Sequence, residues 1–164
     1  MYNTPIVAEE FDVPLTLETD RMRLRPLTMA DAFKDFDAVM TSEKRLKTVF
    51  REDGDWPTGL TLEQNIMELG WHQTEFELRT SFAYTVVSLD ESTVLGCMYI
   101  YPTTRGNYEV EVTMWVRESE AESGLDEHLY ETVRHWLEQT WPFDNIAYPG
   151  RQTSWTEWDA LGGQ

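Results

Sequence analysis

The stretch WVRESEAESGLDEHLYETVRHWL, residues 115–137, predicts a strand end, a turn and a helix in direct succession. Its first residues are apolar, and an acidic turn that contains Gly124 follows them. Apolar side chains then recur at helical spacing, at Leu125, Leu129, Val133, Trp136 and Leu137. The first N–H groups of such a helix have no partner within the helix, so they can bind an anion. The stretch therefore favours a turn that is placed to hold a phosphate group.

Three strands are predicted directly before this turn. Residues 81–89, 93–102 and 107–116 are rich in β-branched and aromatic side chains, and short polar turns separate them. Turns of this length join antiparallel neighbours, so we expect a three-stranded meander. Because side chains alternate along a strand, the third segment has an apolar core face and a second, wetter face. The second face carries Glu109, Glu111, Thr113 and Trp115.

Two helices are predicted between a first strand and this meander. Residues 15–27 alternate apolar and charged side chains, as in a half-exposed strand. Thr28 and Asp31 form a capping-box pattern at the start of the first helix. Its apolar positions are Ala32, Phe33, Phe36, Val39 and Met40. The second helix covers residues 61–78, and the loop at residues 50–59 either lines a substrate mouth or is a polar turn packed on the core.

A short strand at residues 145–150 and a short helix that Ser154 and Glu157 cap are predicted after the quoted helix. A chain of 164 residues, 41% of them apolar, can bury one core, so we expect a single domain over residues 1–164. The order strand, helix, helix, meander, helix, strand predicts an α/β fold of the α+β type. We expect a mixed sheet of about five or six strands with helices on both faces.

The chain is strongly acidic, with 30 Asp and Glu against 13 Lys and Arg and a formal net charge of −17. This charge repels nucleic-acid phosphates and anionic membrane surfaces, so we expect neither nucleic acid nor a membrane as a partner. It favours a cationic ligand such as a small amine or a basic peptide.

Cys97 is the single cysteine and lies in an apolar run, so no intrachain disulfide can form. The first residues lack the pattern of a signal peptide, and no segment is long and apolar enough to span a bilayer, which favours a cytoplasmic protein. His72, His128 and His135 lack the spacing of a zinc site. We therefore expect no metal and interpret these histidines as structural or surface residues.

The order of elements and several local sequences resemble the acyl-CoA N-acyltransferase (GNAT) superfamily. LETDRMRLRPLTMADA, residues 17–32, is similar to the opening of the branch that acetylates ribosomal-protein N-termini. VLGCMYIYP, residues 94–102, resembles the third strand of that family, and VEVTMWVRES, residues 110–119, resembles its fourth strand. The resemblance covers roughly residues 15–148 and implies a three-layer α-β-α sandwich with a mixed, largely antiparallel sheet.

The resemblance also implies a function, the transfer of an acetyl group from acetyl-CoA to a small amine or a basic peptide. In that family the end of the fourth strand offers backbone groups to the pantetheine arm, and the following turn wraps the pyrophosphate. The matching positions here are Met114, Trp115 and Val116 in the strand and Ser123, Gly124 and Leu125 in the turn. The family's acidic base matches Glu111, and Glu109 shares its face, although both can also be interpreted as solvated surface acids.

Two features depart from the family pattern. Glu122 and Asp126 place negative charge beside the expected pyrophosphate, which predicts weak acetyl-CoA binding or none. Helix capping by the residues of this turn is an alternative interpretation of the same acids. After Tyr148 we expect room for one short helix and no further hairpin, so the family's general-acid tyrosine has no expected counterpart.

These departures leave a second function open, a non-catalytic GNAT-like module that binds another ligand or a protein and has lost acetyl-CoA binding. A V-shaped opening between the fourth and fifth predicted strands, residues 107–116 and 145–150, that no side chain fills would favour the acyltransferase, whereas closure by Trp155 or Trp158 would exclude it. Because the sheet ends early, its open edge and exposed tryptophans predict a homodimer.

Overall fold

The computed structural model describes residues 2–50 and 54–162. Within them, one six-stranded sheet has its strands in the order in which they occur in the chain. The strands are β1 (Leu17–Glu18), β2 (Arg23–Pro26), β3 (Phe82–Val87), β4 (Val94–Pro102), β5 (Val110–Val116) and β6 (Ile146–Ala147). The helices are α1 (Ala32–Met40), α2 (Glu43–Val49), α3 (Leu62–Glu77), α4 (Leu125–Thr140) and α5 (Trp155–Ala160), with short 3-10 turns η1 (Met29–Asp31) and η2 (Glu118–Glu120).

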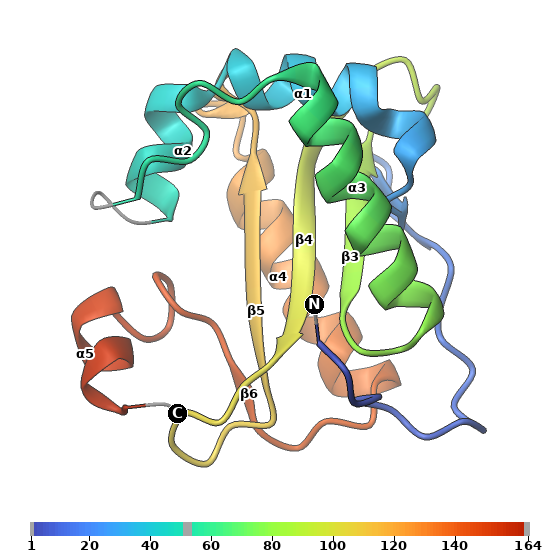
Figure 1. Ribbon diagram of the computed structural model, residues 1–164, viewed down its shortest axis with the longest axis vertical. Helices are drawn as coiled ribbons and strands as arrows, with labels where there is room; N and C mark the ends of the chain where they lie inside the picture. Colours follow the sequence, from blue (N-terminus) through green and yellow to red (C-terminus); the bar gives the residue numbers. More distant parts are fainter. Residues whose placement is uncertain (1, 51–53, 163–164) are drawn as a thin grey trace.

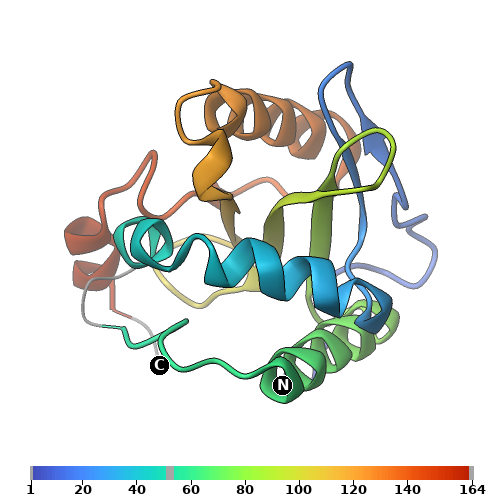
Figure 2. The same ribbon diagram turned by 90° about the horizontal axis from the view of Figure 1, so that it is seen from above.

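The sheet lies between two layers of helices (Figure 2). α4 covers one face and α1 and α3 cover the other, while α2 and α5 lie on the β5 side of the molecule (Figure 1). Neighbouring strands from β1 to β5 are antiparallel, and β6 is parallel to β5. The predicted three-layer α-β-α sandwich with a mixed, largely antiparallel sheet is therefore confirmed.

The helix α2 is a difference from the sequence prediction. α1 ends at Met40, and the buried Ser42 side chain accepts a hydrogen bond from the Glu118 N–H at 2.8 Å, which fixes the turn between the two helices. Leu46 is the buried residue of α2. A helix with so small a buried face has no repeating apolar pattern that could reveal it in the sequence.

Side chains on both faces of the sheet are buried. Val112 and Met114 of β5 pack in the core on the α4 side, whereas Trp115 is fully buried in the core on the opposite side. The prediction that this second face is wet is therefore wrong at Trp115. The half-buried part of that face is limited, within β5, to Glu111 and Thr113.

β5 and β6 are parallel neighbours joined by α4. Their pairing joins Val110 to Ile146 and Glu111 to Ala147. Beyond this short pairing the later part of β5 keeps main-chain groups that β6 does not reach. The sheet therefore opens next to the turn that precedes α4.

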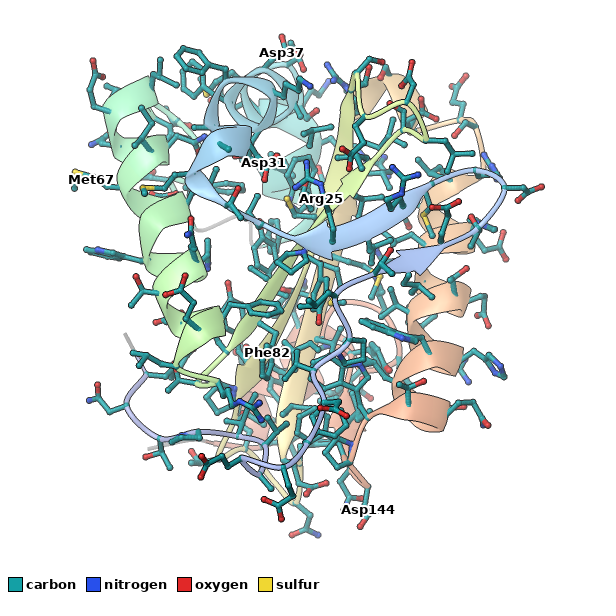
Figure 3. The ribbon with its side chains drawn as sticks, turned by 90° about the vertical axis from the view of Figure 1, so that its right-hand side faces the viewer. Arg25, Asp31, Asp37, Met67, Phe82 and Asp144 are labelled. Atoms are coloured by element: carbon teal, nitrogen blue, oxygen red, sulfur yellow. The ribbon has the colours of Figure 1, made fainter. Side chains whose placement is uncertain are left out.

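The predicted signals at the helix starts are confirmed. Capping boxes are present at Thr28, Thr61 and Ser154. Arg25 of β2 donates hydrogen bonds to both carboxylate oxygens of Asp31, at 3.0 and 2.8 Å, and Figure 3 shows the two side chains pointing toward each other. This pair ties the start of α1 to the sheet and so fixes the position of the helix over β4.

Candidate functional site

A cleft opens where the pairing of β5 and β6 ends. We call it the β5–β6 cleft, and its cavity has a volume of about 210 Å³. It is lined by α2, β5, the start of α4 and the segment after β6, with Arg45, Phe50, Thr113, Met114, Asp126 and Arg151 among its residues. A cavity is therefore present where the acyltransferase interpretation requires an opening, and the side chains of Arg45, Arg151 and Trp155 line it.

Two arginines and one carboxylate meet in this cleft. Arg151 donates to both carboxylate oxygens of Asp126 at 2.9 Å, and Arg45 lies 3.8 Å from the same carboxylate. Burial on its own would raise the pKa of Asp126, but the hydrogen bonds from Arg151 and the charges of both arginines outweigh it, so the pKa is lowered. Asp126 is therefore a paired carboxylate in a cluster with one positive charge in excess, and the predicted weakness of acetyl-CoA binding stays a prediction.

The same arginines contact the open edge of β5. Arg151 Nη2 donates to the Met114 carbonyl oxygen at 3.2 Å, and Arg45 Nε donates to the Val116 carbonyl oxygen at 3.1 Å. Main-chain groups alternate in direction along an antiparallel strand, so those of Trp115 face β4. Of the strand residues predicted to hold the cofactor, Met114 and Val116 therefore offer main-chain groups at the open edge, whereas Trp115 does not.

The predicted turn residues lie at the N-terminus of α4. Gly124 has a φ of 79°, the left-handed conformation that favours glycine. The Ser123 hydroxyl accepts a hydrogen bond from the Leu125 N–H at 3.2 Å, and Arg21 donates to the Ser123 carbonyl oxygen at 3.0 Å. Glu122 is exposed. The turn thus combines a helix N-terminus with a third arginine, which favours an anion there.

Neither C-terminal tryptophan closes the cleft. Trp155 lines one side of it, and its indole N–H donates to the Val49 carbonyl oxygen at 3.3 Å. Trp158 is buried against Tyr108 and Arg105 and is not among the residues that line the cleft. Its burial also removes part of the basis for the predicted homodimer, because the C-terminal tryptophans are not the exposed anchors that the sequence suggests.

A second cavity of about 220 Å³ lies between α1, α3 and the sheet. We call it the α1–α3 cavity, and its lining includes Asp35, Asn65, Glu68, His72, Tyr99 and Tyr101. Trp56 also lines it, while residues 51–53 of the predicted loop lie outside the described residues. Phe50 and Thr113 line both cavities, so the two meet at the edge of β5.

Asp35 is a buried carboxylate of the α1–α3 cavity. It accepts hydrogen bonds from the Asn65 amide at 3.0 Å and from the Cys97 thiol at 3.4 Å. Burial raises the pKa of Asp35 to about 6 in spite of these hydrogen bonds. Burial also raises the pKa of Glu68. At neutral pH the cavity therefore holds carboxylates whose negative charge is poorly hydrated.

His72 lies in the same cavity. Its ring is tilted against that of Tyr99, with centroids 5.3 Å apart, and its Nδ1 atom is buried with no hydrogen-bond partner among the described residues. Burial lowers the pKa of His72, which favours the neutral ring. The sequence alone gives no reason to separate this histidine from a structural one.

The two predicted catalytic acids have different surroundings. Glu111 lies on the same face of β5 as Thr113, and its register partner on β4 is Tyr101. Tyr101 lines the α1–α3 cavity, whereas Glu111 is not among the described residues that line it. The Glu109 carboxylate instead accepts hydrogen bonds from the backbone N–H groups of residues 144–145 at 2.7 and 2.8 Å. Glu109 thus holds the loop that leads into β6.

Several site residues are not predicted from the sequence. A signal did exist for Asp35, because Ala32, Asp35 and Val39 share the buried face of α1 and an acid in that position is unusual. Arg45 and Arg151 come from separate elements, and no local pattern brings them to the cleft. Among the described residues, no group of three His, Cys, Asp or Glu side chains could hold a metal ion, and no helix is long and apolar enough to cross a membrane.

Solved structures with a similar fold are acetyltransferases. A ribosomal-protein-S5-alanine acetyltransferase from Vibrio fischeri has a TM-score of 0.67 and 17% identity, over 92% of this chain and 82% of that one. RimJ from Mycobacterium smegmatis, solved with CoA-disulfide, has a TM-score of 0.63 and 16% identity, over 77% and 61% of the two chains. An acetyl transferase from Salmonella typhimurium that modifies the N-terminal serine of ribosomal protein L7/L12 has a TM-score of 0.58 and 12% identity, over 74% and 66%.

No protein-family model matches the chain, and no curated protein matches it in sequence. The chain spans less than two thirds of the RimJ structure. At identities of this size the similarity concerns the fold. The resemblance predicted from the sequence is confirmed at that level: the chain has the fold of GNAT acetyltransferases.

Proposed function

We propose that the protein is an acyl-CoA-dependent N-acyltransferase that moves an acetyl group from acetyl-CoA to an amine. The junction of two cavities at the open edge of β5 carries this proposal. The β5–β6 cleft contains two arginines and the carboxylate of Asp126, the described lining of the α1–α3 cavity contains two carboxylates and no Lys or Arg, and Phe50 and Thr113 line both. A transfer reaction needs its two substrates held in contact, and Thr113 marks the place where an anionic donor and a cationic acceptor can meet.

The residues of the β5–β6 cleft fit acetyl-CoA. The carbonyl oxygens of Met114 and Val116 face the open edge, and each has a second lone pair that can accept a hydrogen bond from an amide of a pantetheine arm beside the arginine it already binds. Arg45, Arg151 and the helix N-terminus at residues 123–125 supply positive charge for the phosphates. Bound there, acetyl-CoA would supply the acetyl group as a thioester.

We assign proton acceptance to Glu111. An ammonium ion must lose a proton before its nitrogen can attack a thioester. Glu111 lies two residues before Thr113 on the same face of β5, and its register partner Tyr101 lines the α1–α3 cavity, which supports this assignment. Glu109, the second predicted acid, is assigned a positioning role, because it holds the loop before β6 and so helps to set the width of the cleft.

The acceptor belongs to the class of amines, and protein N-termini are one candidate within it. The acetyl transferase from Salmonella typhimurium modifies the N-terminal serine of a ribosomal protein, so N-terminal peptides belong in an acceptor panel together with small amines. We place the activity in the cytoplasm, where a free thiol such as that of Cys97 stays reduced.

Calorimetric titration with acetyl-CoA tests donor binding, and amine-dependent release of free CoA tests transfer. We expect both, and we expect Arg151→Gln to weaken acetyl-CoA binding about tenfold or more. Arg134→Gln is the matched control, because it removes the same charge from a partly exposed position on α4 whose ion pairs lie within that helix. A folded protein that does not bind acetyl-CoA would overturn the proposal in favour of a non-catalytic GNAT-like module.

A further inference from the structure

Asp35 is a buried carboxylate whose described partners are all neutral. Its side chain is buried, and it accepts hydrogen bonds from the Asn65 amide and the Cys97 thiol. Within residues 2–50 and 54–162, no Lys, Arg or His side chain forms an ion pair with it. Buried carboxylates are nearly always paired with a cation, because an isolated charge loses its hydration. A cationic ligand would complete this site.

The cavity around Asp35 offers a further acceptor for such a ligand, because Glu68 lines it with a second carboxylate. Burial raises the pKa of Asp35, and the charge of Glu68 adds to the rise. The described residues that line the cavity include no Lys or Arg. The surroundings therefore favour a donor-rich cation and disfavour an anion.

Aromatic rings form the other walls of the cavity. Tyr99 and Tyr101 are stacked with centroids 5.7 Å apart, and Phe50 meets Trp56 edge to face at 5.7 Å. The faces of such rings attract ammonium ions and also pack against apolar groups. The volume of about 220 Å³ has room for roughly seven to ten non-hydrogen atoms, if the volume per atom in a liquid is taken as a guide.

We propose that the α1–α3 cavity binds a compact primary or secondary ammonium ion with a short apolar body, a free small amine and not the N-terminus of a folded protein. The ammonium group donates hydrogen bonds to Asp35 and Glu68, and the apolar body packs on Tyr99 and Trp56. The role of this amine as acetyl acceptor rests on the proposed function. Its binding to the cavity does not, because the carboxylates and rings that hold it belong to the chain itself.

Calorimetry in the absence of acetyl-CoA tests this site, with 2-phenylethylamine and its uncharged isostere 2-phenylethanol as probes. We expect the amine to bind at least tenfold more tightly than the alcohol. Glu68→Gln should weaken amine binding about fivefold or more and leave alcohol binding unchanged. Glu63→Gln, which removes the same charge from an exposed position in the first turn of α3, should change neither. Asp35→Asn should remove the preference for the amine.

Equal affinity of the unmodified protein for the amine and the alcohol would overturn the proposal. So would an unchanged amine affinity in the Glu68→Gln variant, or binding of an N-terminal tripeptide in preference to the small amine. Amine binding without any acetyl transfer would support the cavity assignment and reject the proposed function. Acetyl transfer by a protein that does not prefer the amine to the alcohol would support the proposed function and reject the cavity assignment.

Discussion

The Asp126 carboxylate has two effects in the β5–β6 cleft: it binds the arginines, and it competes with a phosphate for them. The substitution Asp126→Asn tests both. The carboxylate accepts two hydrogen bonds of 2.9 Å from Arg151 and lies 3.8 Å from Arg45. A diphosphate that binds the same arginines must share them with this carboxylate. The substitution keeps the shape of the side chain and removes the competing charge, so we expect the variant to bind CoA more tightly.

The size of the effect follows from Coulomb's law. A phosphate held by Arg151 would lie on the order of 6 Å from the Asp126 carboxylate, where two like unit charges repel by about 3 kcal/mol at an effective dielectric constant of about 20. The Asp126 side chain is 29% exposed, so solvent and salt reduce this to about 1–2 kcal/mol, or roughly five- to thirtyfold in Kd. The lost charge-assisted hydrogen bonds should lower the free energy of unfolding by about 1–2 kcal/mol.

Calorimetric titration with CoA at fixed ionic strength measures the first effect, and urea unfolding measures the second. Glu127→Gln is the matched control, because it removes the same charge from an exposed position in the same helical turn. We expect the control to change the Kd by less than twofold. Weaker CoA binding by a well-folded Asp126→Asn variant would show that the carboxylate orients the arginines for the ligand, and competition between carboxylate and phosphate would then be refuted.

Glu111→Gln should lower kcat for acetyl transfer by about a hundredfold or more with little change in the KM for acetyl-CoA, because it removes a proton acceptor and no donor contact; steady-state kinetics measure both. Burial raises the pKa of Asp35 to about 6, so its ionisation destabilises the folded protein as pH rises from about 4 through 6. Urea unfolding measures the difference in free energy of unfolding between Asp35→Asn and the unmodified protein. Between pH 4 and pH 7 this difference should shift in favour of the variant by up to about 3 kcal/mol, and a difference that is independent of pH would contradict the prediction. Gly96→Ala should lower the free energy of unfolding by about 2 kcal/mol or more, because an added Cβ would lie 1.9 Å from the Trp115 carbonyl oxygen; unchanged urea unfolding would argue against this close contact. Light scattering should give the mass of a homodimer, because the open edge of the sheet favours pairing with a second copy, whereas a monomeric mass at all concentrations would reject the dimer.

The fold could be predicted because its signals are local. Alternation identifies β5, and capping boxes locate the starts of the helices. The same local patterns fail where tertiary contacts determine which side chains are buried. Phe33 is counted among the apolar positions of the first helix but is 73% exposed, whereas Asp35 is buried. The face of α1 that meets the sheet is therefore offset from the one that the apolar spacing suggests.

The net charge of the β5–β6 cleft could not be predicted, because a sequence lists the charged residues but does not show which of them form ion pairs. An acid-rich turn predicts repulsion of a phosphate when Glu122 and Asp126 are considered alone. Arg151 reaches Asp126 across 25 residues, and this contact depends on the path that the chain takes after β6. The short pairing of β5 and β6 that opens the cleft is likewise a property of three-dimensional register.

Local placement of charge, and not the net charge of −17, decides which ligands each cavity can hold. The surplus of acids repels an anion such as CoA at long range, but at physiological ionic strength this repulsion is screened beyond about 8 Å. Arg45 and Arg151 act at contact distance and are only partly exposed, so salt weakens their attraction much less. In the α1–α3 cavity, the charges of the buried Asp35 and the half-buried Glu68 are also protected from screening by salt. An acidic protein can therefore bring an anionic donor and a cationic acceptor to one strand edge, because the opposite charges that attract them lie in separate cavities.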